Sequence, residues 1–311
     1  MLSRRNIRVK VMQILYSLSR DSEMSLADLK QRYKTNVDNS YGLFLFNLLY
    51  LVKVIEYSVT DGKNRLSKHL PTEADKTFTA KLFDNELVKS LQSNSMLQEF
   101  WDKYKLPDRV DTDTVRSLYT EFSKKAEYKA FLEEKSTDLK GYQQILLQLY
   151  KFCNSNEVFN EVMDDFYWSW DDDKSLVVGT IKKTIKALPE QTDFFEKSQP
   201  DEEVTMEFGQ KLLINVVEQD KELLGIIEPT LKNWDADRVA VMDMILIKMA
   251  LSELISFPTI PTKVTLNEFV EISKLYSTDK SKDFINGILD RLMKKLNKEG
   301  KIHKTGRGLM E

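Results

Sequence analysis

Residues 239–255 read VAVMDMILIKMALSELI, and this segment determines how the C-terminal part of the chain packs. Asp243 and Lys248 interrupt a nearly continuous apolar run, and a helix that is apolar on almost every side has to be buried. Asp237 can cap the start of this helix, and Pro258 ends it. The pattern therefore predicts a central helix on which the neighbouring helices pack.

Amphipathic segments on both sides of this stretch supply the neighbours. Glu202–Gln219 repeats apolar residues at intervals of four, and Thr265-Leu-Asn-Glu268 has the spacing of a capping box near the start of the next helix. The last helix starts near Ser281 and buries one apolar face, made of Ile285, Ile288, Leu289, Leu292 and Leu296. The basic tail after Gly300 has no such pattern and is expected to be flexible.

The first helix is predicted to be amphipathic and basic. Its apolar residues recur at spacings of three and four, while Arg4 and Arg8 share the polar side. Tyr41–Ile55 is the most apolar segment, but Asn47 and Lys53 interrupt it, and it falls short of the ~20 apolar residues that cross a bilayer. We therefore expect a buried helix there and no membrane partner.

The whole chain is predicted to be all-α. Ten glycines and seven prolines are too few for a turn-rich β architecture, and no strand-like alternation is found. We expect one helix over about Ser25 to Tyr33 and a second over Asn39 to about Val59, ended by Asp61-Gly62. Shorter amphipathic pieces follow, and we interpret residues from about 60 to 199 as a helical insertion.

Charge is segregated along the chain. The formal net charge of −3 alone argues against a nucleic-acid partner, but residues 1–20 hold five bases and no acid, and residues 291–311 hold seven bases against two acids. The compensating acid lies in the interior, above all in Asp164–Asp173. That run fits either a site for a metal or a basic protein or a solvent-facing surface, and adjacent carboxylates without a fixed loop favour the solvent-facing surface.

Patterns for catalysis or metal binding are missing from the sequence. It has no Gly-rich phosphate loop and no nucleophile elbow, and His69 and His303 lack Cys or His neighbours at metal-ligand spacing. The single cysteine, Cys153, excludes an internal disulfide, and the N-terminus lacks the unbroken apolar segment that export needs. We expect a cytoplasmic protein that is not an enzyme and binds no cofactor or metal.

Two parts of the chain carry longer motifs. Near the N-terminus, Arg4-Arg5-x-x-Arg8 is followed by Val11-Met-Gln-Ile-Leu-Tyr-Ser17. The C-terminal part contains three elements in order: Lys263-Val-Thr-Leu-Asn-Glu268, Glu271-Ile-Ser-Lys274 and Phe284-Ile-Asn-Gly-Ile-Leu-Asp290. In type, order and spacing these motifs resemble the family of the transcription antitermination factor NusB, over roughly residues 1–20 and 201–296.

The resemblance implies a NusB-like helical bundle of two small subdomains, here with an additional helical insertion. Residues 21–59 fit either the shared fold or the insertion. On this basis we divide the chain into a basic N-terminal helix (1–20), a helical region that is largely insertion (21–200), a C-terminal core (201–298) and a basic tail (299–311).

The resemblance also implies a function. Family members bind boxA-like single-stranded RNA of ribosomal leaders together with the small-subunit ribosomal protein NusE, in the transcription elongation complex with RNA polymerase. Matched residue by residue, the RNA contacts are assigned to Arg4, Arg5, Arg8, Lys248 and Phe284. Tyr16 and Asp243 match positions that face the ribosomal protein.

Each of these assignments has a structural alternative. The arginines also fit a solvated helix face, Phe284 fits a core position, and Tyr16 and Asp243 fit contacts within the chain. We interpret Gly287 as a packing residue, because a glycine inside a helix costs ~1 kcal/mol relative to alanine. Lys280 departs from the family pattern, which has an acid there, and this bears on base contacts near Phe284.

Two other functions remain alternatives. The first is a protein-binding scaffold in which the insertion has replaced RNA binding, which fits the net acidity. The second is the RNA-binding part of a ribosomal RNA methyltransferase, which needs a Rossmann-like domain and a catalytic cysteine. The sequence around Cys153 is helical in pattern, which disfavours the enzyme.

Overall fold

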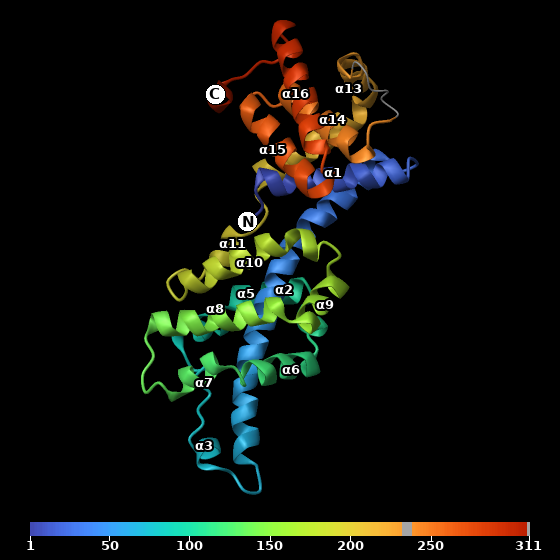
Figure 1. The fold of residues 1–311 in the computed structure, drawn as a ribbon. Coiled ribbons are helices and arrows are strands. Elements are labelled where there is room, and N and C mark those ends of the chain that lie inside the picture. Colours follow the sequence, from blue (N-terminus) through green and yellow to red (C-terminus); the bar gives the residue numbers. More distant parts are fainter. Residues whose placement is uncertain (232–237, 310–311) are drawn as a thin grey trace. The chain divides into compact units, whose positions relative to one another are not determined.

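The computed structural model describes residues 1–231 and 238–309 (Figure 1). These ranges contain sixteen α-helices, short 3-10 turns and one π-helix, with no strand among them, so the all-α prediction is confirmed. The chain divides into two compact units, unit 1 with Met1 and Asp38–Gln199, and unit 2 with Leu2–Val37 and Pro200–Glu311. Asp237, the predicted cap of the central helix, lies outside the described residues.

Helix α2 (Leu26–Leu66) follows α1 (Arg4–Arg20) and contributes residues to both units. The sequence predicts two helices here, and the structure has one unbroken helix of 41 residues. The segment contains no proline to interrupt it. Gly62, where we placed a break, continues the helix, and a Cβ there would lie 3.3 Å from the ring of Phe78.

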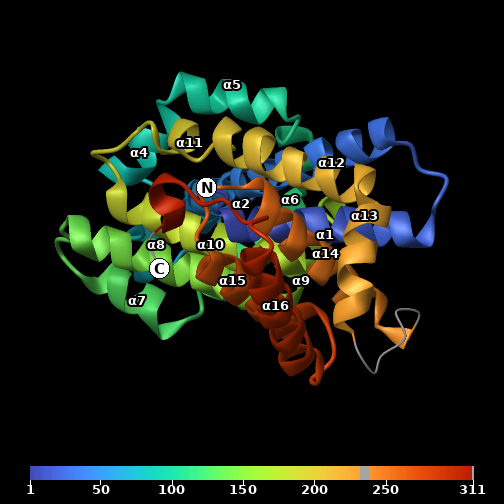
Figure 2. The same cartoon turned by 90° about the horizontal axis from the view of Figure 1, so that it is seen from above.

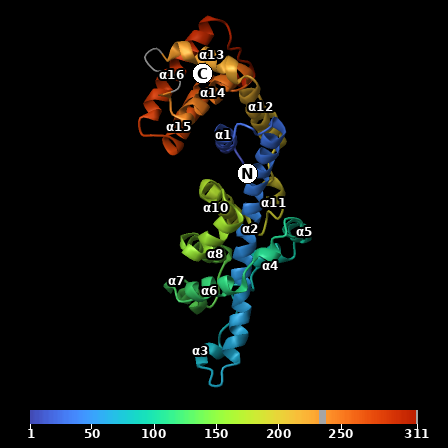
Figure 3. The same ribbon diagram turned by 90° about the vertical axis from the view of Figure 1, so that its right-hand side faces the viewer.

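Unit 1 surrounds the C-terminal part of α2 with shorter helices. Within it, α6, α7, α8 and α10 lie on one side of α2, and α4 and α5 lie on the other (Figure 3). The helices are α3 (Glu73–Lys76), α4 (Glu86–Gln92), α5 (Ser95–Lys103), α6 (Thr112–Phe122), α7 (Ala126–Glu133), α8 (Leu139–Ser155), α9 (Glu157–Phe166), α10 (Trp170–Ala187) and α11 (Phe194–Lys197).

The apolar segment of α2 forms the centre of the unit 1 core. Of its most apolar window, 78% is buried, which confirms the expected buried helix although α2 is long and apolar enough to cross a bilayer. Asn47, which interrupts the apolar run, is fully buried and satisfied, because Tyr150 Oη donates to its Oδ1 at 3.0 Å and its Nδ2 donates to the Leu43 carbonyl at 3.0 Å.

Unit 2 is built on α14 (Val241–Ser256), which packs on α1, α12, α13, α15 and α16 (Figure 2). Leu246, Ile247 and Leu254 are completely buried, so the predicted central helix is confirmed. The remaining elements of this unit are the π-helix η2 (Glu203–Gln210), α12 (Lys211–Glu218), α13 (Asp220–Ile227), α15 (Thr262–Tyr276) and α16 (Ser281–Lys298).

The predicted capping box at Thr265 is wrong. Helix α15 begins earlier, at Thr262, directly after Pro261, which has the backbone angle that suits a helix start. Thr265 therefore lies inside the helix, completely buried, and its hydroxyl donates to Glu253 Oε1 at 2.7 Å. The residue stabilises a contact between helices instead of a helix end.

The basic tail, expected to be flexible, makes defined contacts with the loop that follows α14. Lys304 Nζ donates to the Phe257 carbonyl at 3.0 Å, and the Thr305 N–H donates to the Pro258 carbonyl at 3.0 Å. Gly308 is buried at the same place, where a Cβ would lie 1.9 Å from the Pro258 oxygen. Its lack of a side chain permits this close approach.

Gly209 in η2 allows α1, α2 and η2 to approach one another within unit 2. A Cβ at this position would lie 2.0 Å from Tyr33 Oη and 2.4 Å from Ile7 Cγ2. Both neighbours are buried, and Tyr33 Oη is fixed by its hydrogen bond of 2.7 Å to the Thr205 carbonyl. Neither has room to move away.

We predict that Gly209→Ala destabilises the protein by ~1–3 kcal/mol, because overpacking outweighs the better helix propensity of alanine. Gly225→Ala in α13 is the matched control, since a Cβ there meets nothing within 4 Å. It should leave stability unchanged or raise it by up to ~1 kcal/mol. Urea denaturation measures both, and equal stability of the two variants would contradict the proposed close approach.

Candidate nucleic-acid interface

Arg8 forms a buried ion pair instead of an exposed contact. Its guanidinium donates two hydrogen bonds of 2.7 Å to the two carboxylate oxygens of Glu253 in α14. The side chains are only 2% and 0% exposed. The Phe208 and Phe269 rings lie 5.1 and 5.7 Å from the guanidinium carbon, within cation–π range.

This geometry corrects the expectation that Arg8 contacts RNA phosphates. A guanidinium forked onto a buried carboxylate has its charge neutralised and its donors occupied. Arg8 therefore holds α1 against α14 and does not present a charge to solvent. The sequence analysis does not identify its partner Glu253. An acid on a helix that must be buried on almost all sides could have predicted a buried ion pair.

Arg5, three residues before Arg8 in α1, is more exposed to solvent than Arg8. It donates to both oxygens of Glu268 in α15, at 2.8 and 2.7 Å, while its side chain stays 53% exposed. Glu268 also lies 3.5 Å from the Arg8 guanidinium, so one carboxylate joins Arg5 and Arg8. Arg4 is 38% exposed and pairs with Glu203 of η2 at 2.9 Å.

Lys248 lies on α14 and pairs with Asp220 of α13, with 2.5 Å between Nζ and Oδ1. Its side chain is 14% exposed. Both residues line a hollow of about 420 Å³ whose other walls are largely apolar, including Leu15, Val216 and Ile245. The Lys248 ammonium is therefore at the edge of an apolar surface of unit 2.

Phe284 is half-buried in the first turn of α16, and its N–H donates to the Lys280 carbonyl at 3.3 Å. Lys280, just before this turn, and Lys282, within it, are exposed. One turn further, Gly287 does not fit the packing role that we expected, because a Cβ there would meet nothing within 4 Å. A side chain at position 287 would therefore start in free space.

Asp243 and Tyr16 make contacts within unit 2. Asp243 is 5% exposed and accepts hydrogen bonds from the Ser277 and Ser281 hydroxyls, at 2.5 and 2.8 Å. It thereby ties α14 to the turn between α15 and α16. Tyr16 is half-buried, and its hydroxyl accepts from the Arg20 guanidinium at 2.8 Å.

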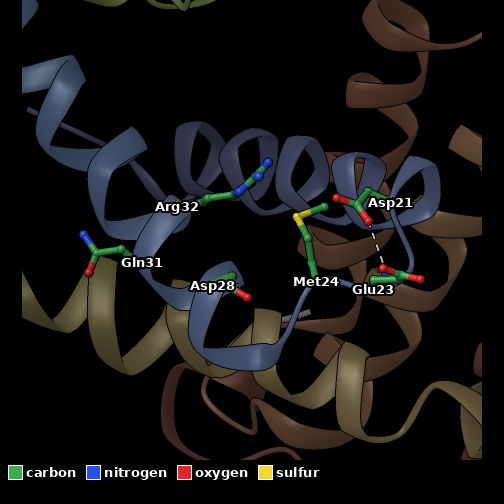
Figure 4. A pocket seen from close by; sticks show the side chains of 6 residues that line it. All are labelled: Asp21, Glu23, Met24, Asp28, Gln31 and Arg32. Carbon is green, nitrogen blue, oxygen red and sulfur yellow. Dashed lines mark hydrogen bonds between the residues drawn. The ribbon is translucent and has the colours of Figure 1, made fainter.

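The remaining candidate sites are a polar hollow and the Cys153 thiol, and neither offers a metal site or a reactive group. The hollow of about 380 Å³ in Figure 4 is lined by Asp21, Glu23 and Asp28 beside Arg32, and within the described ranges no group of three or more His, Cys, Asp or Glu could hold a metal ion. Burial raises the pKa of the Cys153 thiol to about 12, which keeps it protonated and unreactive.

The C-terminal part of the chain matches a known protein family. Residues 169–294 match the model of the NusB family, and the chain therefore carries a NusB family domain in its C-terminal part, with an additional helical region before it. The match starts at residue 169 and so includes α10 and α11, which we had assigned to the insertion.

Relatives of the chain include proteins named transcription antitermination protein NusB. The protein of Salinibacter ruber is 39% identical over 106 residues, which is 34% of this chain and 66% of that protein. The relatives from Chloroherpeton thalassium and Natranaerobius thermophilus are 38% and 46% identical over 101 and 72 residues, or 32% and 23% of this chain. The chain spans 48% and 52% of their lengths. No solved structure matches the chain significantly.

The buried pair makes a quantitative prediction for stability. Glu253→Gln should cost ~3–5 kcal/mol in the free energy of unfolding, because it leaves the Arg8 charge buried without a counter-charge. The double variant Arg8→Met with Glu253→Leu should recover most of that loss, since it removes both charges together. Glu268→Gln, at a carboxylate that is 19% exposed, is the control and should cost less. An equal loss in Glu253→Gln and Glu268→Gln would refute the special role of burial.

Proposed function

We propose that this protein is an RNA-binding transcription antitermination factor. It binds a boxA-like single-stranded ribosomal leader RNA together with the small-subunit ribosomal protein NusE, and it acts in the cytoplasm on the elongation complex with RNA polymerase. The observation that carries the proposal is the NusB family domain over residues 169–294, with relatives named transcription antitermination protein NusB. No catalytic role is part of it.

The proposed phosphate contacts come from Arg5 and Arg4 on the outer side of α1. Both guanidinium groups are partly exposed, and each is already oriented by a carboxylate, from Glu268 and Glu203. A phosphate has the same fork-accepting geometry as a carboxylate, so it can share or replace these partners. Arg8 supports Arg5 through their shared partner Glu268 and does not itself contact the RNA.

Base recognition is proposed for Phe284, which is half-buried at the start of α16. A partly exposed phenylalanine can stack on an unpaired base, which is worth ~1–3 kcal/mol per base. The exposed Lys280 and Lys282 supply positive charge around that ring. Lys248, with its charge shared with Asp220, is proposed as a weaker phosphate contact.

The two kinds of RNA contact predict different signatures in binding measured against salt. Arg5→Ala should weaken binding to all single-stranded RNAs and reduce the salt slope by ~0.7, as expected for one lost phosphate contact. Phe284→Ala should keep the slope and reduce the preference for a boxA-like RNA over a scrambled one by ~1–3 kcal/mol. Thermal unfolding of both variants is the control for folding. Wild-type protein that binds no RNA, even with the ribosomal protein present, would sink the proposal and favour the scaffold alternative.

For the ribosomal protein, Tyr16 is the proposed direct contact, and Asp243 acts through the turn that it ties to α14. Tyr16→Ala should weaken binding of the ribosomal protein and leave binding of RNA alone unchanged. Asp243→Ala should weaken both, because it frees the Ser277 and Ser281 hydroxyls next to the Phe284 surface. Titrations with each ligand separately measure this. Loss of RNA binding in Tyr16→Ala would contradict the division of roles.

A further inference from the structure

Helix α10 presents a basic face that none of the contacts above uses. Its buried side is made by Trp170, Val177, Ile181 and Ile185, at helical spacing. The other side carries Gly179 and three lysines at positions 182, 183 and 186, which share one stripe of the helix. All three lysines are exposed.

These lysines differ from the arginines of α1 in one respect. Arg4, Arg5 and Arg8 each lie within ion-pair distance of a carboxylate of unit 2. Among the described residues, by contrast, no carboxylate pairs with Lys182, Lys183 or Lys186. Exposed, uncompensated cations attract polyanions most strongly, because no internal partner has to be displaced.

A groove of about 480 Å³ runs beside this face, within unit 1. The two charged side chains among its lining residues, Lys183 and Lys197, are both lysines, although Lys197 also pairs with Asp193 at 2.8 Å. Its wall includes Gly179, where a Cβ would meet nothing within 4 Å. The groove therefore has room at the point where the lysine stripe begins.

The helix dipole explains only part of this pattern. A base in the last turn of a helix is favoured by the partial negative charge there, and Lys186 lies in that turn. Lys182 and Lys183 lie before it, where the effect of the helix end has fallen off. Their clustering needs another cause, and an anionic ligand provides one.

From these observations we infer that the α10 face and its groove are a second binding surface for single-stranded RNA, which contacts the phosphate backbone without reading its sequence. This inference rests on the proposed RNA-binding function. RNA is favoured over an acidic protein because α10 lies inside the NusB family match, residues 169–294, and relatives that share this domain are named antitermination proteins.

The first test removes the charge of the stripe in the full-length protein. The triple variant Lys182→Gln, Lys183→Gln, Lys186→Gln should bind a labelled leader RNA more weakly and show a salt slope lower by about 2, or ~0.7 for each contact. The control removes three exposed lysines elsewhere in unit 1, with Lys124→Gln, Lys129→Gln and Lys135→Gln. It changes the net charge equally and should bind RNA like the wild type.

The second test uses the open position in the groove. Gly179→Glu and Gly179→Lys both introduce a residue that favours helix, and its Cβ would meet nothing within 4 Å, so neither should lower the unfolding temperature. Gly179→Glu should weaken RNA binding, whereas Gly179→Lys should match or exceed the wild type. Equal binding by these two variants would overturn the electrostatic surface.

The outcomes separate this inference from the function on which it rests. If the wild type binds RNA, Arg5→Ala weakens it and the triple lysine variant behaves like its control, the α10 surface is refuted while the proposed function stands. If the lysine variants lose binding to the ribosomal protein or to RNA polymerase and keep RNA binding, α10 docks a protein and the inference fails. If the wild type binds no RNA, both fail.

Discussion

The ion pair between Arg8 and Glu253 is the constraint on which unit 2 depends. It joins residues 245 positions apart in the sequence and fixes the first helix of the chain to the central helix α14. Two buried charges are costly to desolvate, so such a pair persists only where the geometry is good and the remaining donors and acceptors are satisfied. Both conditions hold here, because the Arg8 fork meets both oxygens of Glu253, and the Thr265 hydroxyl donates to one of them.

The outer charges of α1 are arranged around that pair. Glu268 bridges Arg8 and Arg5, so the orientation of the exposed guanidinium follows from the buried one. An arginine held in this way loses less conformational freedom when it meets a phosphate. The same pairing offsets its positive charge, so in the proposed function α1 orients a bound RNA strand more than it attracts one. The unpaired lysines of α10 have the complementary property.

Unit 1 illustrates how a long apolar helix becomes the core of a helical unit and not a membrane span. The short helices of unit 1 cover α2, and its polar residue Asn47 is satisfied by Tyr150 inside that core. A second buried polar group, the Trp101 indole N–H, is also satisfied, because it donates to the Leu45 carbonyl at 3.1 Å. These bonds fix the register of α5 and α8 on α2, which apolar contacts alone specify less sharply.

The fold class, the buried state of Tyr41–Ile55 and the central position of α14 could all be predicted from the sequence, because apolar periodicity and the scarcity of glycine and proline are local properties. The sequence also identified the C-terminal family motifs, residues 263–290, which lie within the NusB match over residues 169–294, whereas the N-terminal motif lies outside that match. Local patterns could not decide which charges are used inside the protein. Arg4 and Arg8 share one polar side in the sequence pattern, yet only tertiary packing buries Arg8 on Glu253 and leaves Arg4 38% exposed. The predictions of a capping box at Thr265 and of a packing role for Gly287 were wrong for the same reason. The neighbours of a side chain depend on helices that are distant in sequence, and periodicity does not encode them.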